Sequence, residues 1–228
     1  MKKTLHIFYI HYNIEGSDRK NRPQWFDYEK CLKNLLETIE GREDVKLYIM
    51  MDGDKNNFIS NYNLTTYYEL HNSGRNNFLR SWEYAKSIAL KENSEKDLFY
   101  FLENDYLHVQ GWVDKVFELF DTYSNLNYIS LYDHNDKYFL PMYDNLTSKI
   151  FTTPTHHWRT TPSTCGTHIV DRKTFLEDYD IPFQIVGDHN KWLWLNQNKS
   201  RSVLTPIPGL STHCMEGLMS PTINWETI

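Results

Sequence analysis

The sequence predicts a mixed α/β fold in which a mostly parallel sheet carries helices on both faces. Two patterns lead to this prediction. Over residues 1–132, apolar runs of strand type alternate with segments of helical periodicity, which is typical of a sheet with parallel strands. Some of these runs end directly in acidic or amide residues, and ligands bind at the carboxyl ends of strands in open α/β sheets. With 228 residues, 40% of them hydrophobic, the chain can bury a substantial core.

The first predicted motif is a strand, a helix and a second strand. Residues 5–10 and 46–51 are apolar runs that suit buried strands. Between them, residues 25–39 place aromatic and aliphatic side chains at helical spacing. A helix that connects two strands in this way predicts a parallel pair.

The alternation continues to residue 132 and then fades. The next predicted elements are, in order, a helix at 78–89, a strand at 98–102, a helix at 111–120 and a strand at 128–132. Beyond residue 133 the periodicity is weak, and such a long irregular stretch indicates a functional loop or hairpin region. The last predicted elements are a strand at 167–171, a short helix from Lys173 and a helix around 189–195. We expect a single domain over residues 1–228.

Composition excludes several classes of protein. A formal charge of −6 argues against a nucleic-acid partner, because gripping a phosphate backbone needs a basic surface. The amino-terminal MKKTLHIFYIHYN has too short an apolar stretch for a signal peptide, and no later run approaches the roughly 18 apolar residues of a membrane span. Three cysteines, an odd number far apart in the chain, are typical of reduced thiols. We therefore expect a cytoplasmic protein with no stable membrane insertion.

Two carboxylates follow the strand predicted at 98–102. Its apolar residues run directly into Glu103, Asn104 and Asp105, residue types that rarely extend a strand. Carboxylates two residues apart repel each other unless a cation lies between them, and hard oxygen ligands favour Mg²⁺ or Mn²⁺. A solvated turn is the alternative, but the position at the carboxyl end of a strand favours a metal site.

Three further polar residues are candidates for the site. Asp52, close to Asp54 at the end of a predicted strand, either forms an Asp-Gly turn or binds the base or ribose of a ligand. Asp188 precedes a predicted helix, where it either caps the helix or acts as a general base. His213 lies among turn residues and either packs as an ordinary histidine or completes a metal shell.

Aromatic residues are abundant, with 16 Tyr, 12 Phe and 7 Trp. Trp158 and Trp192 lie in the part of the chain that follows residue 133, and each is a candidate for stacking on the apolar face of a sugar ring. Core packing is the alternative for each. His156, His157 and His168 match no familiar zinc spacing.

Taken in order, these features resemble the GT-A nucleotide-sugar glycosyltransferases, in particular inverting family 2 enzymes and small viral or bacterial relatives. The most specific part of the resemblance is HNSGRNNFLRSWEYAKSIALKENSEKDLFYFLENDY, residues 71–106. That family has an Asn/Gly/Arg loop, a helix and a hydrophobic strand that ends in an Asp-X-Asp motif. Glu103 replaces the first Asp here, and Asp105 matches the residue that usually binds the metal. The resemblance implies a GT-A, Rossmann-like fold and a Mn²⁺ or Mg²⁺ cofactor.

The resemblance also implies a role for each candidate. The residues expected to contact the nucleotide sugar are His11, Tyr12, Asn13, Asp52, Arg75 and Asn104. The expected metal ligands are Glu103, Asp105 and His213, and the expected catalytic base is Asp188. Residues 1–132 would form the half that binds the nucleotide sugar, and residues 133–228 the half that binds the acceptor and carries the base.

The implied reaction moves a sugar from a nucleoside-diphosphate sugar, most commonly UDP-linked, to a hydroxyl of a glycan, lipid-linked or small acceptor. Asp188 would take the proton of the attacking hydroxyl, and a metal that bridges the two phosphates would neutralise the leaving group. Inversion at the anomeric carbon follows from direct displacement, with retention as the open alternative. A lipid-linked acceptor would bring the protein to a membrane surface transiently.

Two other functions stay open. A sugar nucleotidyltransferase also places a metal on an α/β sheet, although NIEGSDRKNR matches a Gly-rich phosphate loop only loosely. A non-catalytic nucleotide-sugar-binding or carbohydrate-binding module would keep the site without turnover. Release of pyrophosphate would favour the first, and binding without transfer would favour the second.

Overall fold

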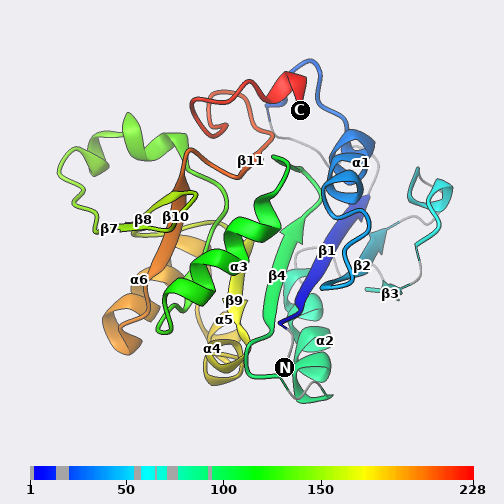
Figure 1. Cartoon of the computed structure of the whole chain (residues 1–228), viewed down its shortest axis with the longest axis horizontal. Helices are drawn as coiled ribbons and strands as arrows, with labels where there is room; N and C mark the ends of the chain where they lie inside the picture. Colours follow the sequence, from blue (N-terminus) through cyan, green and yellow to red (C-terminus); the bar gives the residue numbers. More distant parts are fainter. Residues whose placement is uncertain (1–2, 14–20, 54–57, 65, 71–76, 92–93) are drawn as a thin grey trace. The chain divides into compact units, whose positions relative to one another are not determined.

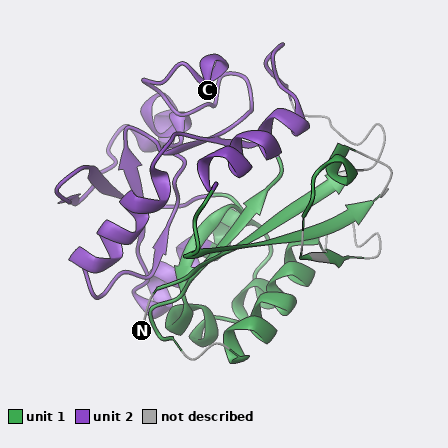
Figure 2. Ribbon diagram, turned by 45° about the vertical axis from the view of Figure 1, so that its right-hand side comes forward, with its two compact units in different colours: residues 1–19, 41–104, 165–191 green, residues 20–40, 105–164, 192–228 purple. Residues whose placement is uncertain are grey.

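The computed structural model describes residues 3–13, 21–53, 58–64, 66–70, 77–91 and 94–228 (Figure 1). The chain packs into two compact units, which Figure 2 shows in different colours. Unit 1 consists of residues 1–19, 41–104 and 165–191, and unit 2 consists of residues 20–40, 105–164 and 192–228. Each unit therefore combines segments that are far apart in the sequence. The expected halves, 1–132 and 133–228, are a functional division and stay a prediction.

Unit 1 is built on strands in the order β3-β2-β1-β4-β9. Their bounds are β1 (Leu5–Asn13), β2 (Val45–Gly53), β3 (Tyr67–Glu69), β4 (Leu98–Glu103) and β9 (His168–Asp171). The strands β1 to β4 run parallel to one another, whereas β9 runs antiparallel to β4. The predicted α/β fold with a mostly parallel sheet is confirmed, and the carboxyl ends of β1, β2 and β4 lie at one edge of this sheet.

Aromatic packing explains why β1 and β4 are central strands. All residues from Leu98 to Leu102 are at most 1% exposed, as the unbroken apolar run predicts. Phe8 of β1 stacks on Phe101 of β4 with ring centroids 5.3 Å apart. On this face the helix α2 (Asn77–Lys91) places Trp82 against Phe101, with ring centroids 4.5 Å apart. Burial of such rings is the main stabilising contribution to this unit.

Short helices complete unit 1. The helix α4 (Arg172–Glu177) begins directly after β9, and the Asp171 carboxylate accepts a hydrogen bond from the Thr174 amide, which satisfies an end group of the helix. The short helices η1 (Phe58–Asn61) and α5 (Ile181–Gln184) also belong here. The helix α6 (Asp188–Lys199) begins in unit 1, and its residues from Trp192 onward belong to unit 2.

Unit 2 contains two sets of strands. The first has the order β6-β10-β8-β7, with bounds β6 (Tyr128–Ile129), β7 (Ile150–Thr152), β8 (His157–Thr161) and β10 (Val203–Ile207). In this set only β6 and β10 run parallel. The second set pairs β5 (Tyr106–His108) with β11 (Ser211–His213) in antiparallel register, so that His213 lies opposite Tyr106.

Two helices of unit 2 are tied to each other and to β5. The helix α1 (Tyr28–Thr38) begins after Asp27, whose side chain accepts a hydrogen bond from the Glu29 amide. The Trp112 indole of α3 (Trp112–Thr122) donates to the Thr38 hydroxyl at 3.1 Å. Beneath α1, a small apolar cluster contains Cys31, Leu107, Cys214 and Trp225. Its members come from four separate stretches of the chain.

Several predicted elements differ in extent from those observed. The helix predicted over 25–39 begins at Tyr28, where the Asp27 cap starts it. The strand predicted at 128–132 ends at Ile129, since the Leu131 carbonyl accepts instead from the amides of Leu210 and Ser211. The irregular region contains the hairpin β7–β8, as its weak periodicity suggested. Within the described ranges, every helix is too short or too polar to cross a bilayer.

Candidate functional site

In unit 1, three of the residues expected at the nucleotide lie together at the ends of β1 and β4. The side-chain amide of Asn104 donates to the Tyr12 carbonyl at 3.2 Å, and its nitrogen lies 3.3 Å from Nδ1 of His11. The Tyr9 hydroxyl donates to the Asn104 carbonyl at 3.5 Å. The residue between the two carboxylates is therefore anchored to the neighbouring strand, and not displayed on a solvated turn.

His11 is buried and uncharged at neutral pH. Its side chain is 1% exposed, and burial lowers its pKa from 6.5 to about 4 because desolvation disfavours the charged ring. The ring lies edge-on to Phe58, with centroids 5.2 Å apart. Within the described part of the chain, Nε2 of His11 has no hydrogen-bond partner. A neutral imidazole in this position can exchange one hydrogen bond with a polar ligand.

Asp52 and Asn13 occupy the adjoining positions of β2 and β1. Asp52 is fully buried and pairs in register with Tyr12, and the Asn13 backbone pairs with Gly53. Gly53 has a φ of 109°, a left-handed value that favours glycine. Arg75, with Asp54, lies outside the described residues. Of the expected nucleotide contacts, β1, β2 and β4 thus bring His11, Tyr12, Asp52 and Asn104 to one edge of the sheet.

The Glu103 carboxylate is oriented by a threonine. The Glu103 amide donates to Oγ1 of Thr167 at 3.1 Å, and this hydroxyl donates to Oε2 of Glu103 at 3.2 Å. Gly166 lies beside the same carboxylate, and a Cβ on this glycine would meet Oε2 at 3.8 Å. The residues that follow the irregular region therefore hold Glu103 in one orientation.

Asp188 is paired with a lysine that the sequence patterns did not single out. Asp188 begins α6 after Gly187, and the Lys191 ammonium lies 3.5 Å from Asp188 Oδ1. The Lys191 side chain is only 7% exposed, and burial lowers its pKa, while Asp188 and Glu103 act in the opposite direction. The spacing of three residues on a helix is the signal that could have revealed this pair. A buried ammonium between carboxylates is a candidate phosphate ligand.

In unit 2, Asp105 and His213 meet as the resemblance implied. The Asp105 Oδ2 atom lies 3.0 Å from Nε2 of His213 and 2.9 Å from Nη2 of Arg22. The pairing of β5 with β11 brings His213 to this position. Arg22 also donates to the Cys214 carbonyl at 2.7 Å and lies over the Phe26 ring. Arg22 was not among the expected site residues, although it ends NIEGSDRKNR, the stretch that matches a Gly-rich phosphate loop only loosely.

A metal bound beside Asp105 and His213 would need further ligands from water or substrate. Among the described residues, no three His, Cys, Asp or Glu side chains are grouped so as to hold a metal ion. Asp105 and His213 supply one carboxylate and one imidazole, and Mg²⁺ commonly takes one or two protein carboxylates together with water and phosphate oxygens. The fit is to a substrate-completed site, and the ligand set Glu103, Asp105 and His213 stays a prediction.

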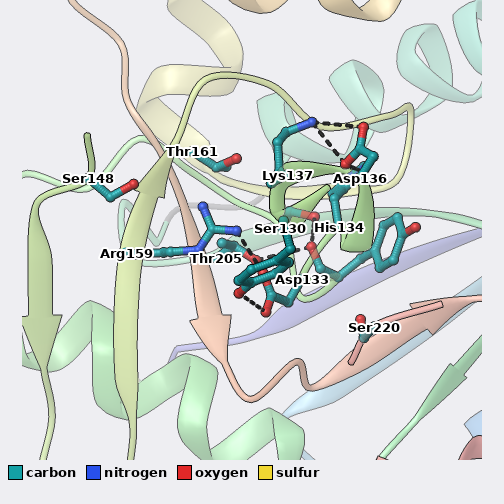
Figure 3. Close-up of polar contacts among 12 residues, drawn as sticks. Ser130, Asp133, His134, Asp136, Lys137, Ser148, Arg159, Thr161, Thr205 and Ser220 are labelled. Carbon is teal, nitrogen blue, oxygen red and sulfur yellow. Dashed lines mark hydrogen bonds and ion pairs between the residues drawn. The ribbon is translucent and has the colours of Figure 1, made fainter. Parts of the chain in front are cut away.

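A second polar cluster is formed by residues of the irregular region of unit 2 (Figure 3). Asp133 accepts a hydrogen bond from Arg159 Nη2 at 2.8 Å and another from the Tyr138 hydroxyl at 2.6 Å. Burial raises the pKa of Asp133, against the effects of Tyr138 and Arg159. His134 contacts the Thr164 hydroxyl at 3.0 Å, and burial holds its pKa well below the usual range.

The hypothesis that Trp158 and Trp192 stack on a sugar is wrong. Trp158 is fully buried and Trp192 is 2% exposed, so neither offers a ring face to a ligand. Trp158 lies in the buried strand β8, and Trp192 packs edge-on against Tyr128, with centroids 5.0 Å apart. Core packing explains both residues.

The chain matches no protein-family profile and no curated protein by sequence. It is similar in structure to CMP:2-keto-3-deoxy-manno-octonic acid synthetase complexed with CTP, with a TM-score of 0.55, 11% identity, and coverage of 91% of this chain and 92% of that one. A second solved structure is 4-diphosphocytidyl-2C-methyl-D-erythritol synthase from Anaerococcus prevotii, with a TM-score of 0.47, 12% identity, and coverage of 90% and 88%. At such identities the first likeness supports the fold and nothing finer.

Proposed function

We propose that this chain is a transferase that acts on a nucleotide and a sugar with the help of a divalent cation. The observation that carries the proposal is the group formed by Asp105, Arg22 and His213. A carboxylate and an imidazole are ligands for a cation, and a guanidinium binds phosphate oxygens. Such a set, two residues after a parallel strand, is suited to a phosphorylated ligand.

Sugar nucleotidyl transfer is the first reaction to consider. The fold resembles a synthetase that was solved with CTP, which favours this reaction over transfer to an acceptor. A sugar oxygen would attack the α-phosphorus of a nucleoside triphosphate, the bond from that phosphorus to the bridging oxygen would break, and pyrophosphate would leave. Arg22 would bind the triphosphate, and Asp105 with His213 would hold the cation.

Glycosyl transfer from a nucleoside-diphosphate sugar is the second candidate. A specific observation favours it: Asp105 and His213, far apart in the sequence, lie 3.0 Å apart, as the resemblance to GT-A glycosyltransferases implied. In this reaction Asp188 would take the proton of the acceptor hydroxyl, and the Lys191 ammonium, 3.5 Å from Asp188 Oδ1, would hold that carboxylate in position.

In unit 1, the Asn104 amide and the neutral His11 ring would bind the nucleoside, and Asp52 would accept from the ribose or base. In unit 2, Arg22 would orient the phosphates. When bound, the cation would neutralise negative charge on the phosphate leaving group.

The product distinguishes the two reactions. The protein would be incubated with CTP or UTP and a panel of sugars, and separately with CDP-, UDP- and GDP-sugars and sugar acceptors, with Mg²⁺, with Mn²⁺ or with chelator. Pyrophosphate release supports nucleotidyl transfer, and release of a nucleoside diphosphate supports glycosyl transfer. If neither product forms and no nucleotide binds in the presence of a cation, the proposal is wrong.

Asp105→Asn should lower the cation-dependent rate by at least about a hundredfold, because an amide is a poor metal ligand and loses its charge-assisted contact with Arg22. Asp121→Asn, an exposed aspartate on α3, serves as the matched control and should retain the wild-type rate. Circular dichroism would show whether each variant is folded. A folded Asp105→Asn protein with the wild-type rate would rule out the assigned role.

A further inference from the structure

Segment 133–146, which follows β6 and contains the short helices η3 (Asn135–Tyr138) and η4 (Pro141–Tyr143), exposes large side chains to solvent. Tyr138 is 55% exposed, Phe139 54% and Met142 66%. In the same unit, Trp158 and Trp192 are buried. Segment 133–146 therefore offers aromatic rings that a ligand can reach.

The Tyr138 ring is held in place by Asp133 and Arg159. Its hydroxyl donates to Asp133 Oδ2 at 2.6 Å, and Asp133 Oδ1 accepts from Arg159 at 2.8 Å. The Arg159 guanidinium carbon lies 5.5 Å from the centroid of the Tyr138 ring. The side chains of Asp133 and Arg159 are only 2% and 7% exposed, and burying such a pair costs free energy that apolar residues would avoid. The pair would be worth this cost if it fixes the exposed Tyr138 ring in one orientation before a ligand binds.

Lys137, which precedes Tyr138 in the chain, is fixed by polar contacts. The Lys137 ammonium contacts both oxygens of Asp136, at 3.2 and 3.1 Å, and the Tyr143 hydroxyl at 3.0 Å. Figure 3 shows the Lys137–Asp136 contact beside the Asp133–Arg159 pair. Asp136 retains 24% exposure, so its carboxylate can accept hydrogen bonds from a ligand.

The charges of this cluster cancel. Asp133 is paired with Arg159, Asp136 is paired with Lys137, and burial keeps His134 neutral by lowering its pKa. The segment also contains the exposed Asp144, so a surface rich in hydrogen-bonding groups with most of its charges paired suits an uncharged ligand better than an anion. An exposed aromatic face beside such groups suits a sugar ring, which has an apolar face and hydroxyl edges.

We propose that segment 133–146 is the subsite for the sugar of the second substrate. The Tyr138 ring would stack on the apolar face of an uncharged sugar ring, and the Asp136 carboxylate, held by the buried Lys137 ammonium, would bind its hydroxyls. The inference rests on the proposed function in one respect, which is that the sugar is a substrate of a transfer reaction. Binding of the sugar itself can be measured without nucleotide or cation.

The test is saturation-transfer-difference NMR with the methyl glycosides of glucose, galactose, mannose and N-acetylglucosamine. At least one glycoside should receive saturation from the wild-type protein. Tyr138→Ala should weaken its binding about fivefold to tenfold, the loss that corresponds to one stacking contact. Tyr68→Ala removes another exposed tyrosine, which is 41% exposed on β3, and should bind as the wild type does.

Tyr138→Phe keeps the ring and removes only the hydrogen bond to Asp133, so a smaller loss of about twofold to threefold is expected from a less restrained ring. If thermal unfolding shows that Tyr138→Ala does not fold, the binding of glycosides to Tyr138→Phe provides the test. The inference is overturned if no glycoside binds, if the folded Tyr138 variants bind like the wild type, or if Tyr68→Ala causes an equal loss. Nucleotide binding without glycoside binding would overturn this inference alone, and the reverse result would overturn the proposed function alone.

Discussion

Burial sets the chemistry of the individual polar residues in both units. His11 and His108 are nearly or fully buried and have pKa values of about 4 and about 3, because the surroundings disfavour the protonated ring. Lys191 shows the same effect on an ammonium group. His11 and His108 are therefore uncharged at neutral pH and act as hydrogen-bonding partners more than as fixed charges.

The lowered pKa of His11 predicts a pH dependence of stability. In the unfolded chain the ring takes up a proton near pH 6.5, whereas in the folded protein it does so near pH 4. Between these values the unfolded state binds more protons, so the free energy of unfolding falls as the pH falls from 6.5 to 4. A shift of this size corresponds to about 3 kcal/mol at most.

Urea denaturation of the wild type and His11→Asn at pH 7, 6, 5 and 4 would measure this effect. The stability difference between the two proteins should move in favour of His11→Asn by up to about 3 kcal/mol as the pH falls to 4. His157→Asn, which replaces an exposed histidine, is the control for the substitution itself. A pH-independent difference for His11→Asn would contradict the assigned burial of the ring.

At the scale of elements, strand register and helix contacts place the site residues. The antiparallel register of β5 and β11 brings His213 to Asp105. The helix α1 is joined to β5 by Asn34, whose amide donates to the His108 carbonyl at 3.0 Å and whose oxygen accepts from the His108 amide at 2.7 Å. One buried side chain therefore satisfies two backbone groups of the strand that follows Asp105.

Asn34→Ala should destabilise the protein by about 2–4 kcal/mol, since it leaves two buried backbone groups of His108 without their partner. Glu37→Ala removes a side chain from the same helix that is 58% exposed, and it should change the stability by less than about 0.5 kcal/mol. Equilibrium unfolding in urea would measure both. Equal, small effects of the two substitutions would show that Asn34 does not anchor α1 to β5.

At the scale of the whole molecule, both units are assembled from interleaved segments. Residues 1–132 contain β1, β2, β3 and β4 of unit 1 but lack β9 and α4, and they lack β8 and β10 of unit 2. Arg22 and Asp105 lie in this part of the chain, whereas His213 does not. The chain therefore completes neither unit until its last third has been made.

Expressed alone, residues 1–132 should show no cooperative thermal transition, because β4 would lose its neighbour β9 and expose the apolar residues that α4 covers. Circular dichroism during heating would test this, with the full chain as the control. A cooperative transition of the fragment would mean that the first half folds independently of β9.

The sequence alone predicted the α/β class, the positions of the main strands along the chain and the presence of polar residues at strand ends. It could do so because buried parallel strands leave unbroken apolar runs, such as Leu98–Leu102, and helices leave a regular spacing of apolar side chains. These are local signals. They also sufficed to select Asp105 and His213 as candidates, through a resemblance in motif.

The folded structure was needed to show which side chains meet and which rings are exposed. Arg22 reaches Asp105 from 83 positions away in the chain, and Thr167 orients Glu103 from 64 positions away, through contacts that leave no periodic trace in the sequence. Composition could not tell buried Trp158 from exposed Tyr138, because both are aromatic residues in the same irregular region. Exposure depends on what packs against a side chain, and that is settled by the pairing of distant strands and not by local spacing.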